Sequence, residues 1–142
     1  LAVTDTLRAA GVNAYPPPDA PVHRPRYTGA LFPTLDNVYD GFFVDLEPGQ
    51  RLVLRGQLPL ARYVSFVFYD RWFNTPDLDA HRCWRTLDDV ESEADGSYEL
   101  VVGPEDPGHP NWLDTAGLRQ GIFAIRCLLT EQRNLPLVSI EE

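Results

Sequence analysis

The chain contains no lysine and no methionine, and its twelve cationic side chains are all arginines. We interpret this bias as a property of a GC-rich genome rather than of the function. The formal net charge is −9, which argues against nucleic acid as a partner because phosphate binding needs clustered lysine and arginine. The same charge argues against binding to an anionic membrane surface.

Cysteine is equally scarce. Cys83 and Cys127 are the only two, and neither lies in a CxxC motif or another short metal-ligating spacing. We expect two buried, reduced thiols, with a disulfide or a catalytic cysteine as the alternatives.

Sequence motifs that indicate a cofactor site or a membrane segment are absent as well. No run approaches the ~18 apolar residues of a transmembrane helix, and the first residues do not resemble a signal peptide, so a cytoplasmic location is expected. The sequence has no Gly-x-Ser-x-Gly elbow, P-loop or GxGxxG. His23, His81 and His109 lie far apart, which disfavours a cupin-type metal site. The sequence therefore predicts no metal and no cofactor.

Proline and glycine, by contrast, are abundant, with 13 and 10 residues in a chain of 142. This length fits one domain, and the composition favours turn-rich β structure. Residues 1–29 are predicted to form a short helix and a proline-rich arm. Thr4 or Asp5 would cap the helix and Gly11 would end it. The arm, from Tyr15 to Pro25, would lie against the domain or contact a partner subunit.

Residues 30–142 are predicted to form a single all-β domain. Two strands, at 61–70 and 121–129, carry apolar residues on both faces and should be central in the fold. A strand that begins at Asn37 should end at a turn over Pro48 and Gly49. The remaining strands are expected at 51–56, 81–85, 89–93 and 97–102, with an edge strand near 138–140. This pattern is typical of an antiparallel β-sandwich of the jelly-roll type.

Several segments together resemble the domain of unknown function 1214 family, especially its actinobacterial forms. The likeness covers roughly residues 30–140, and it is most specific where Asn111-Trp112-Leu113 precedes a strand ending in Arg126. The resemblance implies a jelly-roll β-sandwich, an additional N-terminal domain in many members, and no established catalytic residues. The matching segments are Asn37–Tyr39, Arg62–Tyr69, Asn74, Asp95–Ser97, Asp106–Leu113 and Gly121–Arg126.

Arg126 lies in the middle of a strand, on the same face as Ile122, Ala124 and Leu128. We expect this arginine to be buried, where it must be paired. It would clamp an anionic ligand, or it would form a structural ion pair with an aspartate such as Asp70 or Asp106.

Asn111 and Trp112 follow a loop stiffened by proline. They would either tie down backbone groups and plug the sandwich edge, or form a wall against which a ligand stacks.

The loop after the strand at 61–70 is a further candidate site. Tyr69, Arg71, Asn74, His81 and Arg82 gather there in sequence, and such loops often carry function. His81 could act as a general base oriented by Asp77 or Asp79, or it could be a surface histidine without a role. The acids Asp88, Asp89, Glu91 and Glu93 are interpreted as a solvated face.

Three functions fit these observations. The domain could bind a small molecule, or it could be an accessory or assembly module that forms a homo-oligomer or holds a partner protein through the arm. The alternative is an enzyme of the hydrolase, isomerase or cyclase type acting on a small organic substrate. The enzyme requires Tyr69, Arg71, Asn74, His81 and Arg126 to converge on one cavity.

Overall fold

The computed structural model describes residues 2–15, 36–131 and 134–142. This part of the chain holds one helix and eight strands. The elements are α1 (Ala2–Ala10), β1 (Asn37–Asp45), β2 (Arg51–Gln57), β3 (Tyr63–Asp70), β4 (Trp84–Thr86), β5 (Ser97–Gly103), β6 (Trp112–Asp114), β7 (Gln120–Leu128) and β8 (Leu137–Glu141).

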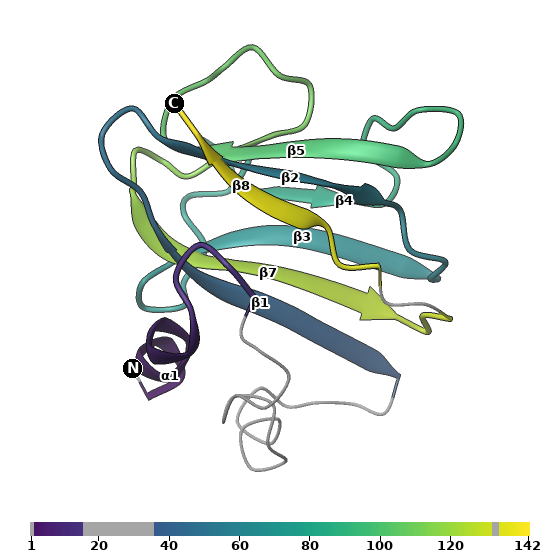
Figure 1. Ribbon diagram of the computed structural model, residues 1–142, viewed down its shortest axis with the longest axis horizontal. Coiled ribbons are helices and arrows are strands. Elements are labelled where there is room, and N and C mark those ends of the chain that lie inside the picture. Colours follow the sequence, from purple (N-terminus) through teal and green to yellow (C-terminus); the bar gives the residue numbers. More distant parts are fainter. Residues whose placement is uncertain (1, 16–35, 132–133) are drawn as a thin grey trace.

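The strands form two four-stranded sheets packed face to face (Figure 1). Sheet A has the order β1-β7-β3-β4, and sheet B has the order β6-β5-β2-β8. All pairings are antiparallel except that of β5 with β6. The predicted all-β sandwich is confirmed. The central positions of β3 and β7 and the edge position of β8 also match the prediction.

The core lies between the sheets and follows from strand alternation. On β3, Val64, Phe66 and Phe68 are fully buried, while the intervening side chains point outward. Phe42 of β1 and Phe123 of β7 join them from the same sheet with ring centroids 5.4 Å apart. Each such side chain stabilises the fold by roughly 1.5–3 kcal/mol through its burial. These side chains therefore fill the space between the sheets along β1, β3 and β7.

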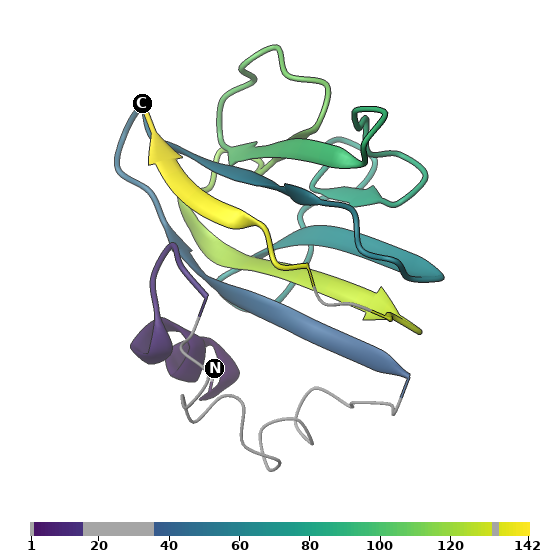
Figure 2. The same cartoon turned by 45° about the vertical axis from the view of Figure 1, so that its right-hand side comes forward.

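Helix α1 packs across the outer face of sheet A at one end, beside β1 (Figures 1 and 2). Its Leu7 is buried against Phe43 and Ile122. The helix ends before Gly11, as predicted, and the amide of Gly11 donates to the carbonyl of Leu7. It begins at Ala2, however, so Thr4 and Asp5 lie inside the first turns and neither is the cap. This helix is too short to cross a membrane, and the described residues contain no other.

The segment after α1 is held against the sandwich. The side chain of Asn13 pairs with both backbone groups of Asp45, at 2.6 and 2.9 Å. Tyr15 follows and packs edge-on against Phe42, with ring centroids 5.0 Å apart. Residues 16–35, which include the rest of the predicted proline-rich arm, lie outside the described residues.

Two strand predictions need correction. Residues 89–93 form no strand, although Gly96 still closes a tight turn with φ +83°. The reason is that the side chain of Asn111, and not a neighbouring strand, supplies hydrogen bonds to Glu91. The strand expected at 81–85 is shorter and later, at Trp84–Thr86. Cys83 and Cys127 are both buried and free, as expected.

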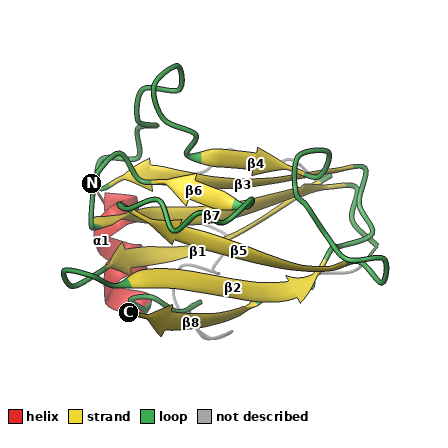
Figure 3. Cartoon of the chain, turned by 90° about the horizontal axis from the view of Figure 1, so that it is seen from above, coloured by secondary structure: helices red, strands yellow, loops and turns green. Residues whose placement is uncertain are grey.

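Figure 3 shows the sandwich from above, with α1 at one end of the strands and β4 and β8 at opposite edges. β4 and β6 lie close together where the two sheets meet along one side. This junction brings the loop before β4 next to the end of β6, and it positions His81 and Asp114.

Candidate functional site

The eight residues predicted for a site lie in three places rather than in one cavity. Arg126 and Tyr69 project from the outer face of sheet A, and Arg71 and Asn74 belong to the exposed loop that follows β3. His81 and Arg82 precede β4, where His81 reaches Asp114 of sheet B. Asn111 and Trp112 lie at the start of β6.

Arg126 is exposed, which corrects the prediction of a buried arginine. Its Nε donates to Oδ1 of Asn37 at 2.9 Å, and its guanidinium lies 5.6 Å from the ring centroid of Tyr39. Neither Asp70 nor Asp106 forms an ion pair with it, and both carboxylates accept backbone amides in their own loops. Among the described residues, α1 covers the face that Arg126 shares with Ile122 at the Ile122 end.

A partly buried arginine does occur in the sandwich, at position 85. Arg85 lies on β4 at the junction of the two sheets, and its Nε is buried without a hydrogen-bond partner in the part of the chain that the structure describes. One terminal nitrogen donates to the carbonyl of Trp112 at 3.3 Å. Burial lowers the pKa of Arg85, and the nearby charge of Arg82 lowers it further. The sequence pattern around this residue did not single it out.

Tyr69 lies on the outer face of sheet A, at the end that α1 covers. Its ring stacks on Phe73 with centroids 4.7 Å apart and an interplanar angle of 4°. Phe73 has a φ of +67°, a strained value for an aromatic residue. Burial raises the pKa of Tyr69, and the positive charge of Arg126 acts in the opposite direction. In the sheet, Tyr69 is opposite Ile122, and Arg126 lies four residues further along β7.

His81 has a partner that the sequence did not indicate. Its Nδ1 lies 2.7 Å from Oδ2 of Asp114, and Oδ1 of Asp114 accepts the amide of Ala116 at 2.8 Å. The expected orienting residues Asp77 and Asp79 do not contact the ring, and Asp77 instead accepts the amide of Asp79. Asp114 is 33 residues away in the chain, so only the fold brings the pair together. An imidazole held in this way has the geometry of an oriented base.

Asn111 ties down backbone groups, as one reading of the sequence predicted. Its side chain is 2% exposed and makes three hydrogen bonds. Oδ1 accepts the amide of Glu91 at 2.8 Å, and Nδ2 donates to the carbonyls of Glu91 and Glu99 at 2.7 and 2.9 Å. Trp112 lies on the edge strand of sheet B and donates from Nε1 to the carbonyl of Gly103. Both residues therefore have structural partners.

The outer face of sheet B carries a groove of about 590 Å³ beside this network. One wall is the segment 91–93 held by Asn111, and the floor comes from β2 and β5. The size is within the range of small-molecule sites. The lining residues are Arg55, Gly56, Gln57, Glu91, Ser92, Glu93, Ser97, Tyr98, Glu99, His109, Pro110 and Asn111.

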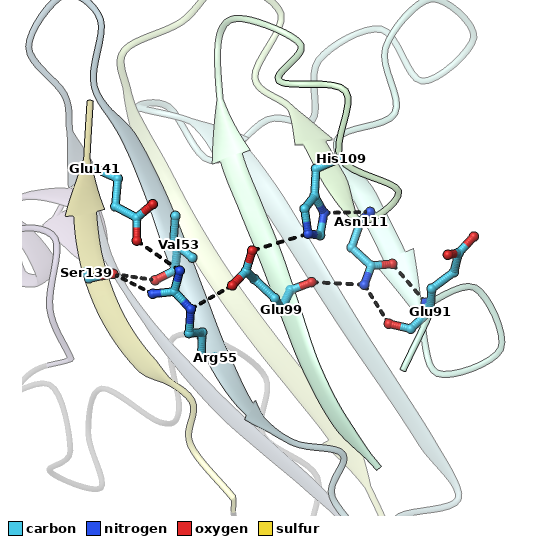
Figure 4. Close-up of polar contacts among 8 residues, drawn as sticks. All are labelled: Val53, Arg55, Glu91, Glu99, His109, Asn111, Ser139 and Glu141. Atoms are coloured by element: carbon cyan, nitrogen blue, oxygen red, sulfur yellow. Dashed lines mark hydrogen bonds and ion pairs between the residues drawn. The ribbon is translucent and has the colours of Figure 1, made fainter. Parts of the chain in front are cut away.

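A chain of charged contacts crosses the groove (Figure 4). Arg55 donates to Glu99 at 2.6 Å and to Glu141 at 2.9 Å, and the two carboxylates raise the pKa of Arg55. On its other side, Glu99 lies 3.3 Å from Nε2 of His109. Glu99 is thus fixed between a guanidinium and an imidazole.

His109 is held in one tautomer. Its Nδ1 accepts the amide of Asn111 at 3.0 Å, so the ring proton sits on Nε2, where it faces Glu99. The polar atoms of Arg55, Glu99 and His109 therefore all have partners. Glu91 and Glu93 also line the groove, but their carboxylates make no ion pair within the described part of the chain. Within that part, no cluster of three or more His, Cys, Asp or Glu could hold a metal ion.

Comparison with known proteins places the fold but not the activity. No protein-family model matches the chain, so the resemblance to the domain of unknown function 1214 family stays a prediction. No curated protein matches it either. An uncharacterised protein from Burkholderia cenocepacia has a similar structure, with a TM-score of 0.85 and 22% identity over 99% of this chain. The VPA0106 protein from Vibrio parahaemolyticus is similar over 76% of this chain, with a TM-score of 0.55 and 17% identity.

Both solved chains are much longer than the part that is shared. This chain spans 38% of the Burkholderia protein and 31% of the Vibrio protein. At these identities the likeness establishes the β-sandwich, and the function must be argued from the surfaces of this chain.

Proposed function

We propose that this domain binds a small organic cation in the groove on the outer face of sheet B. The single observation that supports the proposal most is the surplus of hydrogen-bond acceptors in the groove. Arg55 is neutralised by Glu99 and Glu141, and the Nε2 proton of His109 points at Glu99. The carboxylates of Glu91 and Glu93 have no ion-pair partner in the described chain. A cationic ligand with N–H groups would donate hydrogen bonds to them.

The electrostatics of the whole chain support the same ligand class. A net charge of −9 attracts cations to the surface and repels anions. The groove wall is also preorganised, because Asn111 fixes the backbone at Glu91 before any ligand binds. A site that is rigid in advance spends less of its interaction energy on ordering itself.

An enzyme of the hydrolase, isomerase or cyclase type is not the function that we propose. Such a site needs Tyr69, Arg126 and His81 around one substrate, yet the first two project from sheet A while His81 contacts sheet B. His81 does pair with Asp114. Of the other residues predicted for the enzyme site, none is adjacent to either of them in the sequence.

Agmatine and spermidine are suitable probes for the groove, and succinate is the anionic control. We expect saturable binding of the two cations and none of succinate, measured by isothermal titration calorimetry at low salt. The double substitution Glu91→Gln and Glu93→Gln should weaken cation binding by about tenfold or more, since a hydrogen bond to a charged group contributes ~1.5–3 kcal/mol.

A second double variant, Glu47→Gln with Glu105→Gln, controls for net charge. It removes two carboxylates from exposed positions that do not line the groove. Equal weakening in both double variants would show that the cations bind by diffuse attraction alone, and the proposal would fail. Absence of saturable binding by either cation would also contradict it.

A further inference from the structure

We propose that the outer face of sheet A is a docking surface for a different protein unit, one that presents a carboxylate to Arg126. This inference is independent of the ligand groove, which lies on the opposite face of the sandwich. We call the surface the tyrosine–arginine face and define it by Tyr39, Tyr63 and Arg126.

The three residues come from adjacent strands of sheet A. Tyr39 of β1 is directly opposite Arg126 of β7, and Tyr63 of β3 is opposite the next outward residue of β7, Leu128. Tyr39 is 36% exposed and Tyr63 is 39% exposed. Tyrosine and arginine are the side chains most enriched, with tryptophan, among the dominant contacts of protein interfaces. Their grouping around one strand is therefore the composition expected of a docking surface.

Further aromatic side chains lie at the other end of β3 from Tyr63, where Tyr69 is opposite Ile122 of β7. Tyr69 and Phe73 stack there, and Trp72 beside them is 56% exposed, with the guanidinium of Arg71 5.2 Å from its ring centroid. The loop that presents them is held firmly, because Oδ1 of Asp70 accepts the amides of Trp72 and Asn74. A rigid loop with an exposed tryptophan loses little conformational entropy on binding.

Arg126 identifies the chemistry of the partner. Within the described chain its guanidinium contacts Asn37 and Tyr39 and forms no ion pair with a carboxylate. A partner that covers this face must supply an anion, since an arginine buried without one is costly.

The same residue argues against a second copy as the occupant. The three residues that define the face include no carboxylate, so in a two-fold contact between copies they would offer Arg126 no ion-pair partner, and each chain also carries a net charge of −9. A non-identical unit with an aspartate or glutamate among apolar residues fits better. In the two similar solved proteins the shared sandwich is accompanied by further polypeptide, which is compatible with such a neighbour.

The test begins with a photo-crosslinking amino acid at position 63 of the protein, expressed in the cells that naturally make it. We expect crosslinks to one protein unit, in a segment containing Asp or Glu. That unit is then purified and its affinity measured. The substitution Arg126→Glu should weaken binding by about tenfold or more, and replacing the facing acid by arginine should restore it.

Two controls make the result specific. Arg51→Glu makes the same charge change on the outer face of sheet B and should leave partner binding unchanged. Glu91→Gln with Glu93→Gln should also leave it unchanged, which separates this proposal from ligand binding in the groove. Crosslinks to a second copy or to residues 16–35 would overturn the proposal. So would an absence of crosslinks, equal effects of Arg126→Glu and Arg51→Glu, or failure of the charge swap to restore binding.

Discussion

Replacing Asn111 by alanine is expected to lower the free energy of unfolding by about 3 kcal/mol, because three hydrogen bonds worth ~1 kcal/mol each are lost. The variant leaves the amide and carbonyl of Glu91 and the carbonyl of Glu99 without their side-chain partner. Urea denaturation followed by fluorescence measures the change. The substitution should also loosen the groove wall at 91–93, because Asn111 no longer holds it. Cation binding should therefore weaken together with stability.

Two variants bracket this result. Asn111→Asp keeps the shape and the acceptor for Glu91 but points a negative charge at two carbonyls, so it should destabilise the fold at least as much as alanine at pH 7. Asn74→Ala is the matched control, because the side chain of Asn74 is exposed and makes no hydrogen bond in the described chain. It should change stability by less than about 0.5 kcal/mol. Equal stability of the two alanine variants would show that the Asn111 bonds contribute nothing.

Alkaline pH is expected to destabilise the protein steeply through two buried tyrosines. Burial raises the pKa of Tyr15 and of Tyr98 well above the usual value of about 10. Above pH 10 the unfolded chain therefore releases two protons that the folded chain retains. The contribution of these two tyrosines is complete below pH 10 and falls as the pH rises, by up to ~1.4 kcal/mol per pH unit for each tyrosine and about 3 kcal/mol per unit for both.

The measurement is a series of urea unfolding curves between pH 9 and pH 12. The double variant Tyr15→Phe and Tyr98→Phe should lose most of the slope and none of its stability at pH 7, because neither hydroxyl has a hydrogen-bond partner among the described residues. A smaller slope should remain from Cys83 and Tyr69, whose pKa values are also raised by burial. The chain has no lysine to titrate in this range. An unchanged slope in the double variant would contradict the assignment.

Much of the sandwich could be predicted because side chains of its long strands alternate between the core and the outer face, and the sequence shows this period. Phe66 and Phe68 are separated by one outward residue, as the two-residue period of a strand requires. The segment 89–93 misled the prediction for a physical reason. Its hydrogen bonds come from the side chain of Asn111, a tertiary contact that local pattern does not contain.

The site was harder to predict because it depends on which face of a strand is covered. Arg126 has apolar neighbours on its face, yet that face is open at its position, whereas Arg85 is partly buried by the meeting of two sheets. His81 was assigned to nearby acids, although Asp114 reaches it through the fold. The groove unites Arg55, Glu99 and His109 from three separate segments, so no spacing in the sequence could indicate it.

The packed core between the sheets has a consequence for how the two proposed surfaces would work together. Because the sheets lie back to back, the groove and the tyrosine–arginine face point in opposite directions. A docked protein would leave the groove open, and a bound cation would not block docking. The domain would then serve as a two-sided adaptor that keeps its ligand accessible to solvent while it remains attached to its neighbour.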